Sequence, residues 1–330
     1  MSKLDVYGVG NALVDILAKV DDDFLAAHEL TKGAMMLVDA TRQAGLLNHL
    51  EQHQLSMRSG GSAANTMVAL AQSGGTGTYA GKVAKDTNGE FYRQDMAESG
   101  IGFDVEMAPV AGLPTGTSLI LTTPDAERTM CTNLGVSTTL TAADIDVDRM
   151  KTCKYSYIEG YLWDAEGPRA ACVEAMEQSN KIGIKTSFTF SDSFLVDRFP
   201  DDFRRVAREY CDLVFCNADE AKQLWESDSL EECAKKFAEV VEMAFITDGS
   251  TGCVVVHEGN VATVEGFKAD AVDTNGAGDS FAGGVLYGLT QGKSPLEAAK
   301  WGNYFASRIV QQFGPRLSES LANKVPEILV

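Results

Sequence analysis

The chain has 330 residues, of which 45% are apolar and 23% are charged, with 31 glycines and only 8 prolines. This composition predicts one large or two modest folded domains, and it excludes a disordered or collagen-like chain. The formal net charge is −19, from 47 acidic and 28 basic residues, which argues against nucleic acid as a partner because its phosphates would be repelled.

Hydrophobic periodicity and turn residues divide the first part of the chain into short strands and helices. Residues 4–20 form a mostly apolar run that is broken by glycines, which predicts two consecutive strands. A short helix is expected to begin at the acidic cluster 21–23 and to reach His28. The next elements, in chain order, are a strand at 34–39, a helix at 41–53, a small-residue helix opened by the glycines at 60–61, and a strand at 79–83.

Residues 103–134 have a different character. Threonine and β-branched residues dominate, turns are expected at 113–114 and 123–125, and no amphipathic helix fits. This segment therefore predicts a separate β-rich excursion from the main fold.

From residue 155 onward, apolar strand candidates alternate with helical periods. The strands are expected at 155–159, 182–188, 213–216, 243–247 and 253–257, and the helices at 168–180, 201–210, 218–225 and 230–240. Such alternation is typical of an α/β fold with a parallel sheet and helices on both faces. Two further helices are predicted at 277–291 and 295–312, and no linker divides the chain.

The cysteines and the amino terminus bear on location. Seven cysteines form an odd number without the spacing of a disulfide framework. The polar start Met-Ser-Lys-Leu-Asp lacks the basic and apolar regions of a secretion signal, and no run of about 18 apolar residues could span a membrane. A cytoplasmic protein without a membrane partner is the expectation.

The most informative stretch is residues 273–284, Asp-Thr-Asn-Gly-Ala-Gly-Asp-Ser-Phe-Ala-Gly-Gly. Its glycines allow the amides of Gly276, Ala277 and Gly278 to point one way at the start of a helix, which would form an anion hole. Asp279 in the first helical turn would then lie within reach of a hydroxyl nucleophile. The alternative is an ordinary glycine-rich helix start, with small residues that serve close packing.

Residues 60–65, Gly-Gly-Ser-Ala-Ala-Asn, also open a helix. The glycine backbone leaves room for a ligand, and Ser62 and Asn65 supply polar groups. Alone this pattern is equally consistent with helix packing, but together with the later motif it indicates a binding site.

The two glycine motifs, in this order and separation, resemble the signatures of the ribokinase family of PfkB-type carbohydrate and nucleoside kinases. Within that family, residues 8–16, residues 23–25 and the Asn275 of the second motif are similar to adenosine kinases. The resemblance covers nearly the whole chain. It implies a single ribokinase-like unit, 1–330, with a three-layer core, a mostly parallel central sheet and a small β-sheet lid. The lid would come from about 11–40 and 103–134, and the ATP side of the core from about 210–330.

The resemblance also implies roles for individual residues. Asp279 would be the general base, and Gly276, Ala277 and Gly278 would hold the charge on the transferring phosphoryl group. The acceptor hydroxyls would be bound by Asn11, Asp15, Gly61, Ser62 and Asn65.

On the ATP side, residues 217–220 match the family's Asn-x-x-Glu, in which Glu220 would place magnesium through water. Residues 247–252 match the nucleotide-phosphate loop. The implied nucleotide-binding residues are Asn217, Thr247, Gly249, Gly252, Asn275 and Asn303. The cofactors implied are ATP and Mg²⁺. A role for K⁺ stays open: residues 273–275 and 306–316 lie where some relatives bind potassium, but the match is partial.

Arg128, in the returning strand of the expected lid, would close over the transferred group. The alternative is a solvated arginine beside Asp125 and Glu127. A purine acceptor needs a flat apolar slot, for which the candidates are Leu13, Met35, Met130, Leu134, Tyr161 and Trp163. The two aromatic residues could equally be core packing, and Met35 stands near the position where many adenosine kinases carry glutamine.

The function expected is ATP-dependent phosphorylation of the 5′-hydroxyl of a ribonucleoside, adenosine before others. A sugar kinase acting on ribose or fructose is the alternative acceptor class. A nucleotide-binding sensor without turnover is disfavoured because Asp279 is present. The partners would be the small-molecule acceptor and ATP, and both a monomer and a homodimer remain open.

Overall fold

The computed structural model describes residues 3–103, 105–109, 112–125 and 127–329. Within these residues, the main feature is a nine-stranded sheet. Seven neighbouring strands run parallel, and the last two strands are added by antiparallel pairings. In spatial order the strands are β6 (Ile101–Gly102), β5 (Gly77–Ala80), β1 (Leu4–Val9), β9 (Cys153–Glu159), β10 (Lys185–Thr189), β11 (Leu213–Asn217), β12 (Met243–Thr247), β13 (Gly252–His257) and β14 (Asn260–Glu265). The prediction of a mostly parallel sheet in an α/β fold is confirmed.

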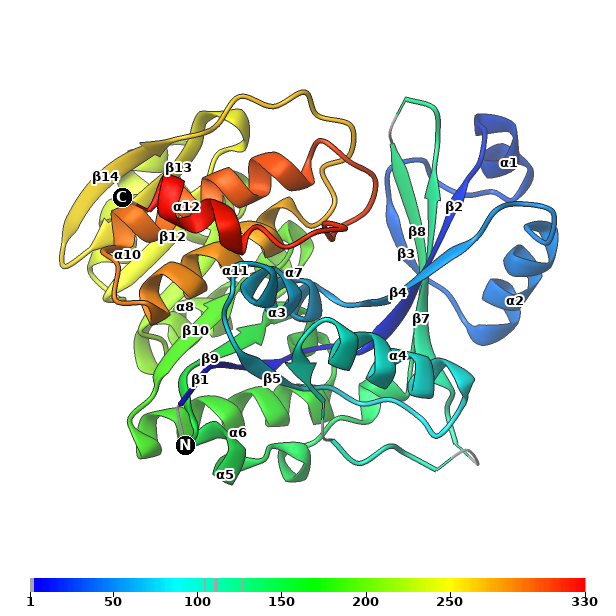
Figure 1. Ribbon diagram of the computed structural model, residues 1–330, viewed down its shortest axis with the longest axis horizontal. Coiled ribbons are helices and arrows are strands. Elements are labelled where there is room, and N and C mark those ends of the chain that lie inside the picture. The colour runs from blue at the N-terminus through cyan, green and yellow to red at the C-terminus, as the bar shows by residue number, and fades with distance from the viewer. Residues whose placement is uncertain (1–2, 104, 110–111, 126, 330) are drawn as a thin grey trace.

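Helices cover both faces of this sheet (Figure 1). Successive residues of a strand point to opposite faces, and here the apolar side chains on both faces are buried. Val6 of β1 packs in one buried cluster, whereas its neighbour Tyr7 packs in the other. The first face is covered by α3 (Ser62–Gln72), α4 (Thr87–Glu98), α11 (Ala277–Thr290) and α12 (Pro295–Ile309). The second is covered by α6 (Glu166–Ile182), α8 (Pro200–Glu209), α9 (Ala218–Trp225) and α10 (Leu230–Ala238). The three-layer core is therefore confirmed.

A second sheet of five strands stands at one side of the main sheet (Figure 1), and we call it the small sheet. Its order is β3 (Met35–Leu37), β8 (Arg128–Gly135), β7 (Thr115–Thr122), β2 (Leu13–Lys19) and β4 (Ser56–Gly60). Two helices accompany it, α1 (Asp22–Ala27) and α2 (Ala40–His49). Because β2 starts shortly after β1 ends, the small sheet begins at the carboxyl end of the main strands.

The segments 11–40 and 103–134, expected to form a lid, contain four of these five strands. The fifth, β4, was not predicted: its sequence Ser-Met-Arg-Ser-Gly has no β-branched or aromatic residue, and it is held by antiparallel pairing with β2. At the start of the segment 103–134, Phe103 packs against Tyr79 of the main core, and Ala108 forms a bridge with Ala84. Lid motion of the small sheet stays a prediction.

Other differences from the expected elements have local causes. β13 is antiparallel to β12 because only residues 248–251 join them, and a parallel crossover needs about a dozen residues or more. α4 was not predicted, since its buried face carries few large apolar residues, chiefly Tyr92 and Met96. The remaining short helices are α5 (Val147–Met150), α7 (Ser193–Arg198) and α13 (Val325–Ile328).

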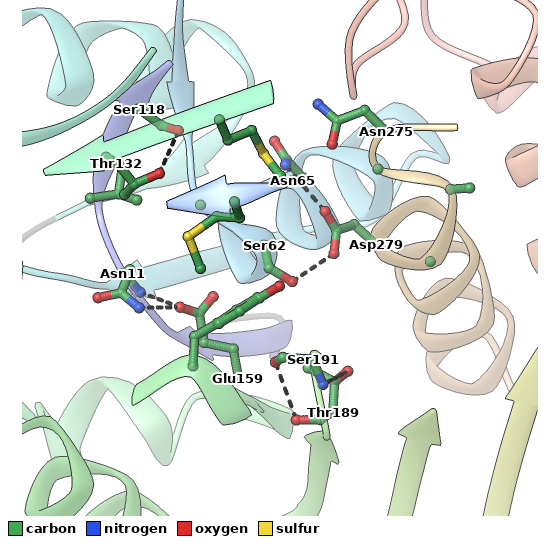
Figure 2. A pocket seen from close by; sticks show the side chains of 18 of the residues that line it. Asn11, Ser62, Asn65, Ser118, Thr132, Glu159, Thr189, Ser191, Asn275 and Asp279 are labelled. Atoms are coloured by element: carbon green, nitrogen blue, oxygen red, sulfur yellow. Dashed lines mark hydrogen bonds between the residues drawn. The ribbon is translucent and has the colours of Figure 1, made fainter. Parts of the chain in front are cut away.

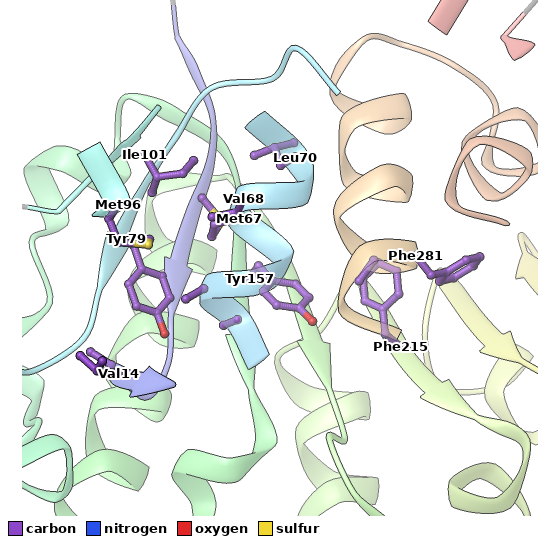
Figure 3. Packing of buried hydrophobic residues seen from close by; sticks show 14 of the residues in the cluster. Val14, Met67, Val68, Leu70, Tyr79, Met96, Ile101, Tyr157, Phe215 and Phe281 are labelled. Atoms are coloured by element: carbon purple, nitrogen blue, oxygen red, sulfur yellow. The ribbon is translucent and has the colours of Figure 1, made fainter. Parts of the chain in front are cut away.

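Helices α3 and α11 lie side by side over the sheet (Figure 3). Met67 of α3 and Phe281 of α11 belong to one buried cluster with Tyr157 of β9. A Cβ added at Gly283 would lie 2.5 Å from the carbonyl oxygen of Thr66, so this glycine permits the close approach of the helices. Their amino termini, which carry the two glycine motifs, consequently meet. Among the described helices, none is long and apolar enough to cross a membrane.

Candidate active site

A cavity of about 520 Å³ opens where the two glycine motifs meet the small sheet. Its volume is within the range of small-molecule sites, about 300–1,000 Å³. Most of the residues that the sequence singled out line it, namely Asn11, Leu13, Asp15, Gly61, Ser62, Asn65, Arg128, Met130, Tyr161, Asn217, Glu220, Thr247, Asn275, Gly276, Ala277, Gly278 and Asp279.

The first glycine motif brings the backbone close to a backbone carbonyl and to a buried carboxyl group. Gly61 has a φ of 102°, and a Cβ there would lie 2.1 Å from the backbone oxygen of Asn11. A Cβ at Gly60 would lie 2.2 Å from the carboxylate of Asp15. Burial raises the pKa of the Asp15 carboxyl to about 7, against the opposing charge of Arg316. Asp15 is thus a buried carboxyl at the cavity wall, suited to accept hydrogen bonds from ligand hydroxyls.

Glu159, which the sequence analysis missed, connects this wall to α3 (Figure 2). Its Oε1 accepts hydrogen bonds from the backbone amide of Asn11 at 2.7 Å and from the Asn11 Nδ2 at 2.8 Å. Its Oε2 accepts from the amide of Ala63 at 2.7 Å. Burial raises the pKa of Glu159 to about 7, and these donors oppose that rise. The available signal for this bracing role was that Glu159 is the one acidic residue of its strand and stands at the carboxyl end.

The second glycine motif starts α11 with a left-handed turn. Gly276 is the N-cap with a φ of 71°, and a Cβ there would lie 2.5 Å from the Cβ of Pro315. The amide of Ala277 donates to the carbonyl oxygen of Thr274 at 3.3 Å. Within the described part of the chain, the amides of Gly276 and Gly278 have no acceptor. Two donors at the positive end of a helix are therefore available to an anion.

The carboxylate of Asp279 faces the same cavity from the first turn of α11 (Figure 2). Its Oδ1 accepts from the Ser62 hydroxyl at 2.6 Å, and its Oδ2 accepts from the Asn65 Nδ2 at 3.2 Å. Burial raises the pKa of Asp279 to about 6, opposed by both hydrogen bonds and by the charge of Arg316. At neutral pH the group is mostly ionised and has a pKa suited to accepting a proton.

Arg128 of β8 crosses from the small sheet to the loop before α11. Its Nε lies 2.9 Å from Asp273 Oδ1, and its Nη2 donates to the Thr274 hydroxyl at 3.1 Å. The arginine is 19% exposed in its side chain. The solvated interpretation is not observed, since Asp125 pairs with Lys32 at 2.6 Å. Arg128 thus places a positive charge beside the glycine loop.

The small sheet gives the cavity an apolar wall. The wall consists of Leu13, Met35, Leu37, Ile120, Met130 and Leu134. The two hydroxyls within it, Ser118 and Thr132, hydrogen-bond to each other at 2.9 Å (Figure 2). From the main domain come Tyr161 and Phe194, with ring centroids 6.2 Å apart. Leu37, Ile120 and Phe194 were not predicted, because nothing in their local pattern separates them from ordinary strand or helix residues.

Comparison with known proteins assigns the chain to a family. Residues 33–321 match the profile of the pfkB family of carbohydrate kinases. The chain belongs to that family. As a pfkB kinase it is a phosphotransferase that acts on an alcohol group.

Several relatives are similar over nearly their full length. The structure of an adenosine kinase from Sinorhizobium meliloti is 38% identical, with a TM-score of 0.90 and 99% of each chain covered. The structure of a probable sugar kinase from Rhizobium etli CFN 42 is 36% identical, with a TM-score of 0.92 and 100% of each chain covered. The curated adenosine kinase 2 of Arabidopsis thaliana is 27% identical over 94% of this chain and 94% of its own.

In this pfkB kinase, Asn217 and Glu220 form the start of α9 and face the cavity. The Asn217 Nδ2 donates to Glu220 Oε1 at 2.9 Å, and the Glu220 amide donates to Asn217 Oδ1 at 2.8 Å. Burial raises the pKa of Glu220 to about 7, reinforced by Asp192 and Asp219. Among the residues that the structure describes, no group of three or more His, Cys, Asp or Glu side chains could hold a metal ion. Glu220 is a cavity carboxylate that could orient the water ligands of a divalent cation.

Three residues expected on the nucleotide side of the kinase lie beyond the cavity lining. Gly249 and Gly252 flank the turn between β12 and β13, with φ angles of 52° and 115°. The Asn303 Nδ2 donates to the carbonyl oxygens of Val264 at 3.0 Å and Glu265 at 3.1 Å, so it holds β14 to α12. Their contact with nucleotide stays a prediction. Trp163, offered for the purine slot, lies in the core instead, with its indole nitrogen donating to Asp202 at 3.0 Å.

Proposed function

We propose that this kinase transfers the terminal phosphoryl group of ATP to the 5′-hydroxyl of adenosine, which gives AMP and ADP. The observation that carries this proposal is the meeting, in one cavity, of the Asp279 carboxylate, the free amides of Gly276 and Gly278, and an apolar wall. The first two suit phosphoryl transfer to an alcohol. The apolar wall suits the flat face of a purine.

The reaction asks the protein for alignment and charge stabilisation more than for covalent chemistry. Asn11 and Asp15 would bind the ribose hydroxyls and so direct the 5′-oxygen toward Asp279. Asp279 would accept the proton of that hydroxyl as the oxygen attacks phosphorus. The amides of Gly276 and Gly278 would stabilise the negative charge on the moving phosphoryl group.

Groups around the reacting atoms would neutralise phosphate charge and exclude water. Arg128 would add a positive charge from the small sheet, and a shift of that sheet over the acceptor would exclude water. A bound Mg²⁺ would neutralise phosphate charge, with Glu220 as the carboxylate that orients its water ligands. A dependence on K⁺, a cytoplasmic location and the choice between monomer and homodimer remain predictions.

A free sugar is the second candidate acceptor, favoured by the similarity to the probable sugar kinase from Rhizobium etli. The apolar wall opposes it. A ribose or fructose molecule would leave part of that wall uncovered and would set its own hydroxyls against Leu13, Met35 and Met130. Hydroxyl groups buried without partners lower affinity.

The test is ADP release with ATP and Mg²⁺ from a panel of acceptors. We expect kcat/KM for adenosine to exceed the values for ribose and fructose by about a hundredfold or more, because only the nucleoside fills the apolar wall. The Asp279→Asn protein serves as the control that the release comes from this site. Sugars that react faster than nucleosides would contradict adenosine as the acceptor and establish the second candidate.

A further inference from the structure

The segment that follows α12 delivers a buried arginine to the back of the acceptor site. The side chain of Arg316 is 6% exposed and does not line the cavity. Its backbone is fixed on both sides: the Gly314 amide donates to Asp273 Oδ2 at 2.9 Å, and the Leu317 carbonyl accepts from the Gln72 side chain at 2.8 Å. The guanidinium is thus held in place by the chain around it.

Arg316 makes three hydrogen bonds behind the first glycine motif. Its Nε donates to Asn65 Oδ1 at 3.0 Å, and its Nη1 donates to the Ser59 hydroxyl at 2.7 Å and to Asp95 Oδ2 at 3.3 Å. Its Nη2 is buried without a partner among the described residues. Burying an arginine with an unused donor is costly, so a purpose beyond packing is indicated.

The hydrogen bond from Arg316 to Asn65 determines which atom of the Asn65 side-chain amide faces Asp279. A guanidinium can only donate, so Asn65 must turn its side-chain oxygen toward Arg316. The amide nitrogen of Asn65 then faces the other way, where it donates to Asp279 Oδ2 at 3.2 Å. Without Arg316 the Asn65 amide could flip and present an oxygen to the carboxylate.

The charges around Asp279 make this donor important. Facing it are Asp15 from β2, Glu159 and Tyr157 from β9, Tyr161 beyond β9, and Arg316 from the C-terminal segment. The carboxylates of Asp15 and Glu159, when ionised, disfavour ionisation of Asp279. The Arg316 charge acts in the opposite direction.

We propose that Arg316 is a positioning residue for phosphoryl transfer: by holding the side-chain oxygen of Asn65, it turns the Asn65 amide toward Asp279 and keeps that carboxylate ionised and fixed in orientation. This inference rests on the proposed role of Asp279 as the base. Arg316 acts through Asn65 and through its charge, without touching the substrate.

The test is the ionisation of Asp279 in Arg316 variants, measured in two ways. One is the pH profile of kcat/KM for adenosine at saturating ATP and Mg²⁺. The other is a carboxyl ¹³C NMR titration of protein labelled at aspartate, in which the Asp279→Asn spectrum identifies the signal. In Arg316→Met we expect both midpoints to rise by about one pH unit, so that activity near pH 6 falls about fivefold and largely recovers by pH 9.

Further variants separate charge from hydrogen bonding. Arg316→Gln keeps a donor for Asn65 without the charge, and Arg316→Lys keeps the charge without the planar fork, so both should shift the midpoint less than Arg316→Met. The matched control is Arg93→Met, which removes the charge of a 53% exposed arginine and should leave the midpoint unchanged. Should Arg316→Met not fold, the Gln and Lys variants carry the comparison.

An Asp279 signal that titrates at the same pH in wild type and in the Arg316 variants would overturn the inference, as would an activity loss that is equal at every pH. A wild type that turns over no adenosine would instead contradict the proposed function. The NMR titration still decides the role of Arg316 in that case, because it needs no substrate.

Discussion

Replacing Asp279 with asparagine is expected to lower kcat for adenosine by about 10²–10⁴-fold. The substitution removes the group that accepts the hydroxyl proton and leaves the apolar wall and the residues Asn11 and Asp15 intact. Adenosine affinity should therefore stay within about threefold of wild type, since the carboxylate acts on the reacting proton and not on the base. Steady-state kinetics and calorimetric titration of adenosine measure the two quantities separately.

The matched control is Asp164→Asn, which changes a second carboxylate of the same cavity. Asp164 pairs with Arg198 and lies in no hydrogen bond with either glycine motif. We expect its kcat to stay within about threefold of wild type. If Asp279→Asn retained a kcat within tenfold of wild type, Asp279 could not be the general base.

Replacing Gly276 with alanine is expected to lower kcat by about 10²-fold, the size of the loss when one oxyanion donor is displaced. The backbone at Gly276 has a φ of 71°, and the new Cβ would lie 2.5 Å from the Cβ and 2.8 Å from the Cα of Pro315. Neither Pro315 nor the loop can give way without moving the start of α11. The amides that would hold the phosphoryl group then shift away from it, and turnover falls more than nucleotide affinity.

The matched control for backbone strain is Gly183→Ala. Gly183 ends α6 with a φ of 74°, and a Cβ there meets no atom within 4 Å. Both variants should lose thermal stability through the left-handed conformation, but only Gly276→Ala should lose turnover. Equal losses of stability with equal kcat values would show that the start of α11 does not act in the reaction.

Much of the fold could be predicted because local patterns and tertiary structure agree. The apolar runs before residue 10 and after residue 155 became strands of the main sheet, since burial on both faces requires such continuous runs. The strand β4 could not be predicted from the sequence Ser56–Gly60, because its extended conformation depends on pairing with β2. Likewise, the antiparallel hairpin of β13 and β14 depends on connection length more than on side-chain pattern.

The site divides in the same way. Asp279, Ser62 and Asn65 were found because each follows a glycine motif at a helix start, where side chains and amides converge on one place. Glu159 lines the cavity and Arg316 lies behind its wall, and the hydrogen-bond partners of both are more than 90 residues away along the chain. Such contacts follow from packing, which one sequence does not reveal. The partner of Arg128 was missed for the same reason, since Asp273 comes from a distant segment.

The measurement that tests the central claim most directly is a crystal structure with adenosine, ADP, Mg²⁺ and fluoroaluminate, which mimics the phosphoryl group in transfer. We predict that the fluoroaluminate accepts hydrogen bonds from the amides of Gly276 and Gly278, and that the 5′-oxygen of adenosine lies about 2.6–3.2 Å from a carboxylate oxygen of Asp279. A complex with the fluoroaluminate away from the start of α11, or with Asp279 still bound to Ser62 and Asn65 alone, would contradict the account.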